Sequence, residues 1–168
     1  MTMTLLSRGP SPFGRKGIFA IRYLGLSDSV DIGAPDDEQS LERLNQPSAF
    51  SAIRAITALF DSRVIMEFLD MLAGGGRIIP AEPGPRFAAL REAAMADGIL
   101  EAALLVTYEG RYRPDQTPYE PWLDLQRGKI GRGLAAMAAH PPAAEPLTVG
   151  GIGLACALEY IDFRKQYD

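Results

Sequence analysis

The stretch from residue 58 to residue 72 constrains the fold more than any other part of this sequence. It opens on the apolar pair Leu59 and Phe60, passes through Asp61 and Ser62, and then places apolar residues at the spacing of one helical face. These residues are Val64, Ile65, Phe68, Leu69 and Leu72. Because Asp and Ser are both favoured at helix N-termini, the sequence predicts a helix that starts at Asp61 and Ser62.

The start of this helix is a candidate binding site for a small carboxylate. The first backbone N–H groups of a helix have no partner within the helix, and the helix dipole places partial positive charge at the same end. Such an end binds anions, and Arg63 adds a positive charge beside it. The alternative is that Asp61 only caps its own helix, and both interpretations fit these residues.

The first third of the chain has the pattern of an α/β unit. Residues 3–7 and 30–32 are short and apolar and are expected to be buried strands. Between them, Pro12 suits the first turn of a helix that Gly25 would end. A strand, a helix and a strand in this order favour a parallel pairing of the strands. Residues 41–44 allow a further one or two helical turns.

The second half of the sequence is predicted to be helical. A Gly run at 74–76 and a Pro-rich stretch at 79–85 indicate a linker, and apolar periodicity then predicts three helices, at 86–112, 120–139 and 147–164. On the first of these we expect Phe87 and Leu105, with other apolar residues, on the inner face. The predicted helix at 147–164 is apolar on all sides, which is typical of an interior helix. Thr148 stands at its N-cap, but Gly151 occupies the place of the acidic residue that would complete a capping pair.

Composition excludes several classes of function. The 168 residues carry a net charge of -4 with no basic block, which argues against nucleic-acid binding. One Cys and one His cannot supply the ligands of a structural zinc site, and we expect no metal. No apolar run reaches the roughly twenty residues of a membrane span, and the N-terminus does not fit a signal peptide. We therefore expect a cytoplasmic protein with no membrane partner.

Two stretches of the sequence resemble glutathione transferases. Residues 58–70 resemble the family segment in which an acidic residue and a serine hold the γ-glutamyl end of glutathione, which implies these roles for Asp61 and Ser62. The run Ser11-Pro12-Phe13-Gly14-Arg15-Lys16 resembles the start of the first helix in bacterial members of the family. The resemblance implies an α/β plus all-α protein.

In this family a thioredoxin-like domain, here residues 1–78, binds glutathione and is followed by an all-helical domain, here residues 84–168. The family usually continues with further helices, so we expect the second domain to be incomplete. The resemblance also implies a homodimer, with the first domain of one subunit against the second domain of the other.

Ser11 is the candidate catalytic residue. A hydroxyl at a helix N-terminus can donate a hydrogen bond to a thiolate, and the helix dipole favours the same negative charge. Both effects lower the pKa of a bound thiol and increase its reactive fraction at neutral pH. The alternative is that Ser11 is only an N-cap, and Ser7 is a weaker candidate for the same role. The function implied is conjugation of glutathione to a small electrophile, a detoxification reaction.

Further site residues follow from the resemblance alone. Tyr108, with Arg111 and Tyr112, would lie near the mouth of the pocket for the electrophile, or on an ordinary helix surface. Arg54 would replace the lysine of a Gly-Lys-Ile-Pro run that contacts glutathione.

The family's cis-proline in that run has no equivalent between Pro47 and Ala58. This departure favours the alternative of a non-catalytic binding or regulatory protein, whereas the absence of a cysteine near the first helix disfavours a thioredoxin-type redox protein.

Overall fold

The first strand organises the N-terminal part of the chain. The computed structural model describes residues 3–35, the backbone of 51–54, and residues 58–165. In it β1 (Met3–Ser7) pairs in parallel with β2 (Val30–Gly33), as the sequence pattern predicted. On its other side β1 pairs antiparallel with β3 (Ser51–Arg54), which itself pairs antiparallel with β4 (Ala58–Phe60). The strand order is therefore β2-β1-β3-β4.

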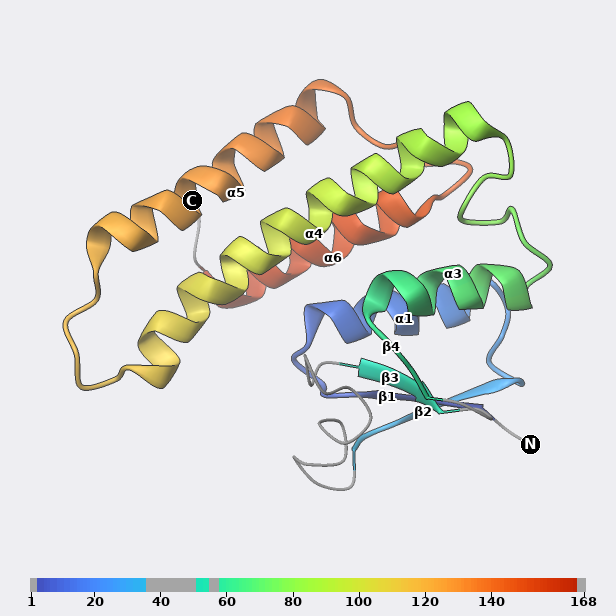
Figure 1. Cartoon of the computed structure of the whole chain (residues 1–168), viewed down its shortest axis with the longest axis horizontal. Coiled ribbons are helices and arrows are strands. Elements are labelled where there is room, and N and C mark those ends of the chain that lie inside the picture. The colour runs from blue at the N-terminus through green and yellow to red at the C-terminus, as the bar shows by residue number, and fades with distance from the viewer. Residues whose placement is uncertain (1–2, 36–50, 55–57, 166–168) are drawn as a thin grey trace. The chain divides into compact units, whose positions relative to one another are not determined.

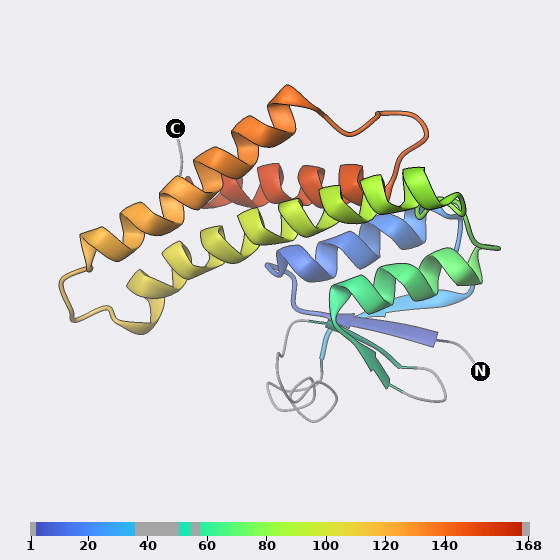
Figure 2. The ribbon, with the colours of Figure 1, turned by 45° about the horizontal axis from the view of Figure 1, so that its top comes forward.

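Two helices cover one face of this sheet. Figure 2 shows α1 (Pro12–Tyr23) and α3 (Ser62–Leu72) side by side above the strands. Both begin where the sequence predicted. Their inner faces and β1 form a core of fully buried aliphatic side chains that includes Leu5, Ile21, Ile65 and Leu69. Hydrophobic burial of this kind is the main favourable contribution to folding.

The chain divides into two compact units, Met1–Pro83 and Gly84–Asp168. The second unit consists of α4 (Pro83–Tyr112), α5 (Glu120–Ala139) and α6 (Val149–Arg164), labelled in Figure 1. Glycines allow close helix packing here: Gly153 of α6 faces Ala96 of α4, and Gly133 of α5 faces Ile99 of α4. The thioredoxin-like fold with a helical C-terminal half is the one that the sequence predicted.

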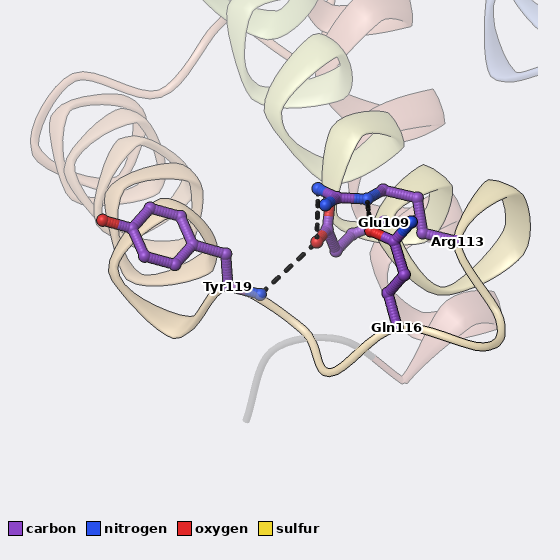
Figure 3. Close-up of polar contacts among 4 residues, drawn as sticks. All are labelled: Glu109, Arg113, Gln116 and Tyr119. Atoms are coloured by element: carbon purple, nitrogen blue, oxygen red, sulfur yellow. Dashed lines mark hydrogen bonds and ion pairs between the residues drawn. The ribbon is translucent and has the colours of Figure 1, made fainter.

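Glu109 fixes the turn between α4 and α5. Figure 3 shows its carboxylate accepting hydrogen bonds from Arg113 at 3.2 Å and from the backbone N–H of Tyr119 at 3.4 Å. Arg113 also donates to Gln116 at 2.7 Å. Since Tyr119 is the N-cap of α5 and has no side-chain capping bond, Glu109 holds one end of each helix. These contacts stabilise the end of α4 that carries Tyr108.

The structure corrects three expectations for the helical half. The interpretation of α6 as buried on all sides is wrong: its buried residues lie on one side of the helix, whereas Leu158 on the other side and Phe163 in the last turn are exposed, Phe163 by 65%. Phe87 and Leu105 of α4 are likewise exposed. Apolar composition does not reveal how much of a helix surface its neighbours cover.

The boundary between the two units, after Pro83, falls inside the stretch 79–85 that was expected to form a linker. Within this stretch Ile79 is buried and α4 already begins at Pro83. The helical turns expected at residues 41–44 lie outside the described residues. Within the part of the chain that the structure describes, no helix is both long enough and apolar enough to cross a membrane.

Candidate functional site

The starts of α1 and α3 lie at the same edge of the sheet. Because β1 and β4 both run antiparallel to β3, they run in the same direction, and the helices that follow them start at their shared carboxyl edge. Only β3 separates the two strands, which places them about 10 Å apart. Two helix N-termini, with their partial positive charges, therefore flank one stretch of this edge.

Ser11 caps the first of these helices. Its backbone is extended (φ -73°, ψ 116°), and its Oγ accepts a hydrogen bond from the backbone N–H of Gly14 at 3.2 Å. The side chain is nearly buried, with 7% of its surface exposed. A hydroxyl that accepts this bond still has its own proton to donate. Ser11 is therefore an N-cap in the structure. Capping leaves its hydroxyl proton available, so it is compatible with donation to a bound thiolate.

The junction between β1 and α1 is tightly packed around Gly14. A Cβ on Gly14 would overlap the hydroxyl group of Ser7, the last residue of β1. Ser7 is also buried, and its hydroxyl donates a long hydrogen bond of 3.3 Å to the carbonyl of Arg8. Gly14 is thus required for the strand end and the helix start to approach each other. This approach fixes the position of Ser11 relative to the sheet.

Asp61 caps the second helix in a strained conformation. Its carboxylate accepts a hydrogen bond from the backbone N–H of Arg63 at 2.8 Å. Its φ is +68°, which residues other than glycine rarely adopt. Such strain costs on the order of 1–3 kcal/mol and is concentrated at functional sites. Asp61 is exposed, whereas the neighbouring Ser62, the first residue of α3, is buried. The bond to Arg63 uses one of the two carboxylate oxygens.

The shared edge carries positive charge in its sequence. Arg8 and Arg15 lie within four residues of Ser11, and Arg63 follows Ser62 directly. Together with the two helix N-termini, these side chains favour a ligand with carboxylate or thiolate groups. Among the described residues no group of three or more His, Cys, Asp or Glu side chains could hold a metal ion.

Strand β3 does not bring the backbone of Arg54, another predicted site residue, to this edge. The register pairs Arg54 with Thr4, at the opposite end of β1, whereas Ser51 pairs with Ser7 at the edge where α1 and α3 start. The backbone of Arg54 is therefore about 10 Å along the strand from that edge. The proposed site accordingly omits Arg54. This segment has no apolar periodicity from which its register could be inferred.

Tyr108 belongs to the second unit. It lies half-buried near the end of α4, and its ring meets the ring of Tyr112 edge-on, with 4.9 Å between the centroids. The guanidinium of Arg111 lies 5.6 Å from the ring of Tyr112. An aromatic pair beside a cation can contact planar apolar groups.

Comparison with solved structures decides the family. A glutathione transferase family member from Pseudomonas fluorescens Pf-5, crystallised with bound glutathione, is 35% identical, with a TM-score of 0.90 over 97% of this chain and 84% of that one. The chain belongs to the glutathione transferase family. A second structure of a family member from the same organism, with bound S-(propanoic acid)-glutathione, is 36% identical over 97% of this chain and 81% of that one, with a TM-score of 0.83.

Sequence comparison agrees with this membership of the glutathione transferase family. The uncharacterized GST-like protein YibF of Escherichia coli K12 is 29% identical over 110 residues, which are 63% of this chain. The match spans about half, 54%, of the length of that relative. No family model matches the sequence.

Proposed function

We propose that this chain binds glutathione at the shared edge of the sheet and conjugates it to a small electrophile. The observation that carries the proposal is the placement of Ser11, Asp61 and Ser62 at two helix starts on one edge of a transferase-family fold. The span of about 10 Å between the strands suits a tripeptide with charged groups at one end. The glutathione bound by the 35% identical relative supports the same ligand for this chain.

The start of α3 holds the γ-glutamyl end of glutathione in this proposal. The exposed carboxylate of Asp61 pairs with the ligand's ammonium group, and Ser62 donates to the ligand's carboxylate. Hydrogen bonds between charged partners are roughly twice as strong as neutral ones. The strained backbone of Asp61 fits this role because a preorganised ligand contact can require an otherwise unfavourable conformation.

Ser11 activates the thiol. Its hydroxyl donates a hydrogen bond to the sulfur of glutathione after the thiol has lost its proton to solvent, and the N-terminus of α1 stabilises the same charge. The thiolate then attacks the electrophilic carbon, an S–C bond forms, and the leaving group departs with its electron pair. Tyr108 contributes to binding of the electrophile through its ring. A reducing cytoplasm would keep glutathione in the thiol form, so we propose that location and a role in detoxification.

Glutathione titration by calorimetry tests the binding step, with Ser62→Ala as the informative variant. Asp61 is the N-cap and Ser62 the first helical residue, so alanine at residue 62 keeps the cap and favours the helix. Loss of one hydrogen bond to a charged group should raise the Kd of glutathione about 10- to 100-fold.

Ser27→Ala is the matched control, because Ser27 is exposed in the turn after α1 and lies outside the proposed site. It should leave the Kd unchanged. Absence of binding heat for the unmodified chain at millimolar glutathione would rule out the proposed function. Equal Kd values for the unmodified chain and Ser62→Ala would remove Ser62 from the site.

A glutathione-binding protein without transferase activity is the second candidate function. It is favoured by the absence of any proline between Pro47 and Ala58, since the family's cis-proline contact with glutathione has no equivalent there. Binding heat without turnover of any model aryl halide would favour this candidate over conjugation.

We also propose that the chain forms a homodimer through the exposed apolar face of β4 and α3. Phe60 of β4 is exposed, and so are Val64 and Met71 of α3, which lie on one side of the helix because they are seven residues apart; Met71 is 63% exposed. Burying these side chains against a second copy would remove apolar area from water. Met71→Glu should therefore shift sedimentation from dimer to monomer. Leu158→Glu, which adds the same charge at an exposed apolar residue of α6, should not, and a monomeric unmodified chain would contradict the proposal.

A further inference from the structure

The last turn of α3 carries a buried carboxylate that the proposed chemistry does not use. Asp70 has 5% of its surface exposed, and this turn contains no basic residue. Its Oδ2 accepts a hydrogen bond from the backbone N–H of Gly76 at 2.9 Å, and its Oδ1 accepts from Arg77 at 2.9 Å, from Ile78 at 2.7 Å and, at a longer 3.4 Å, from Ile79. Burying a charge is unfavourable unless it is hydrogen-bonded, and the C-terminal end of a helix adds negative partial charge. These bonds are therefore needed to keep the carboxylate at this end of the helix.

The backbone of Asp70 also accepts a bond that ends the helix. The N–H of Gly75 donates to the carbonyl of Asp70 at 2.8 Å, and the N–H of Gly74 donates to the carbonyl of Met71 at 3.0 Å. This pair of bonds is the Schellman motif, in which a glycine with positive φ follows the helix. The φ is +100° at Gly74 and +77° at Gly75. We call Asp70 together with residues 74–79 the Asp70 anchor.

Met71 lies inside the turn that the Asp70 anchor holds. Its carbonyl accepts one of the two bonds of the Schellman motif, while its side chain is 63% exposed. Helix α3 has only 11 residues, and helices of this length depend on contacts outside the helix for their stability. The order of the turn that carries Met71 therefore depends on the Asp70 anchor.

Met71 is the last residue of an apolar stripe along α3. Val64, Phe68 and Met71 are spaced by four and three residues, which places them on one side of the helix. Val64 is 47% exposed, and Phe68 is half-buried. The proposed homodimer covers this stripe with a second copy of the chain. A two-fold dimer uses the same surface on both copies, so the last turn of α3 enters such an interface twice.

We propose that Asp70 is a positioning residue for dimer assembly, because its anchor holds the last turn of α3 in the conformation that presents Met71 to the second copy. This inference rests on the homodimer proposed above and involves only residues of the first unit of each copy. When the anchor is open, association must also order this turn and its flexible methionine side chain, at a cost in conformational entropy. The dimer should then form less tightly, although no apolar residue has been removed.

Asp70→Asn in the full chain tests this role. The amide replaces one acceptor oxygen with an NH2 group, which faces N–H donors and cannot accept from them. Hydrogen exchange of the backbone amides at residues 74–79 should accelerate about tenfold or more, while exchange in α1 and β1 stays unchanged. The dimer Kd from sedimentation should rise about tenfold. Asp28→Asn removes the same charge at an exposed residue of the same unit and should change neither value.

Gly75→Ala opens the same turn without changing the carboxylate. An added Cβ on Gly75 meets nothing within 4 Å, so its effect comes from backbone strain at positive φ alone. It should accelerate exchange of the same amides and raise the dimer Kd, and it carries the test if Asp70→Asn does not fold. Faster exchange at residues 74–79 with an unchanged dimer Kd would overturn the inference.

A double-mutant cycle separates the ordering of Met71 from a general loosening of the unit. Met71→Ala removes an exposed apolar side chain, keeps a good helix former in α3 and should itself raise the dimer Kd. Since the anchor acts through Met71, adding Asp70→Asn to this variant should raise the dimer Kd by less than about twofold more. An equal effect of Asp70→Asn with methionine or alanine at residue 71 would show that Asp70 does not act through Met71.

Sedimentation of the unmodified chain distinguishes a failure of this inference from a failure of the proposed homodimer. A monomeric unmodified chain would overturn the homodimer and this inference with it. A dimer whose Kd changes with neither Asp70→Asn nor Gly75→Ala would overturn this inference alone.

Discussion

Ser11→Ala should lower kcat for conjugation about 100-fold near pH 7, because removing one preorganised donor from a developing or bound anion has effects of this size. The Kd of glutathione should change far less, since the γ-glutamyl contacts at Asp61 and Ser62 remain. The measurement is steady-state turnover of a model aryl halide together with calorimetric titration of glutathione. The turnover falls because a smaller fraction of bound glutathione is thiolate, so the pH dependence of the rate should change as well.

The pH dependence of the rate follows from the direction in which Ser11 shifts the pKa of the bound thiol. Ser11 and the α1 dipole lower the pKa of this thiol below the value of about 8.5 for a free cysteine thiol. Without the hydroxyl the pKa rises, so the midpoint of the rate profile moves to higher pH. The deficit of Ser11→Ala should therefore be largest near pH 6–7 and shrink toward pH 9.

Two variants separate this role from capping. Ser11→Ala also removes an N-cap, which costs about 1 kcal/mol, but Ser11→Thr keeps both the hydroxyl and the cap and should restore most of the turnover. Ser7→Ala removes a second buried hydroxyl that packs against Gly14 and should leave the rate profile unchanged. A pH profile that is the same for Ser11→Ala and the unmodified chain would exclude Ser11 from thiol activation.

Local chemistry explains which parts of the fold the sequence could predict. Ser11, Asp61 and Thr148 were each expected to begin a helix, and each side chain accepts a bond from a backbone N–H two or three residues later. Such contacts depend on neighbours in the sequence, so a sequence pattern contains them. The parallel pairing of β1 and β2 was equally accessible, because a strand, helix and strand unit has few alternative arrangements.

Long-range contacts explain what the sequence could not predict. Asp70 was part of the helix pattern, but its partners are N–H groups of residues six to nine positions later, which carry no side-chain signature. Arg54 was assigned to the site by resemblance, and a strand register that no pattern specified places its backbone opposite Thr4. Strand β4 was missed because Ala58–Phe60 has only three residues.

Gly150→Ala should be the most destabilising of the small substitutions in the second unit. Gly150 is buried where α6 packs on α4, and an added Cβ would lie 2.5 Å from the Cβ of Glu92 and 3.3 Å from the carbonyl oxygen of Ala89. Neither atom can move without shifting the α4 backbone. Overpacking of this kind costs about 1–3 kcal/mol, which exceeds the gain of up to about 1 kcal/mol from replacing glycine in a helix.

Gly151→Ala, one residue later, should have the opposite sign. Its added Cβ would meet chiefly Cδ1 of Leu147, the end of a flexible side chain, at 2.8 Å, and the residue is only half-buried. The gain in helix propensity should therefore dominate. Thermal unfolding of both full-length variants under identical conditions should show a lower Tm for Gly150→Ala and an equal or higher one for Gly151→Ala, with about 2–4 °C for each kcal/mol. Both substitutions change the helix propensity by the same amount, and only the space around the added methyl group differs. Equal changes in Tm for the two variants would therefore contradict the close packing of α6 on α4.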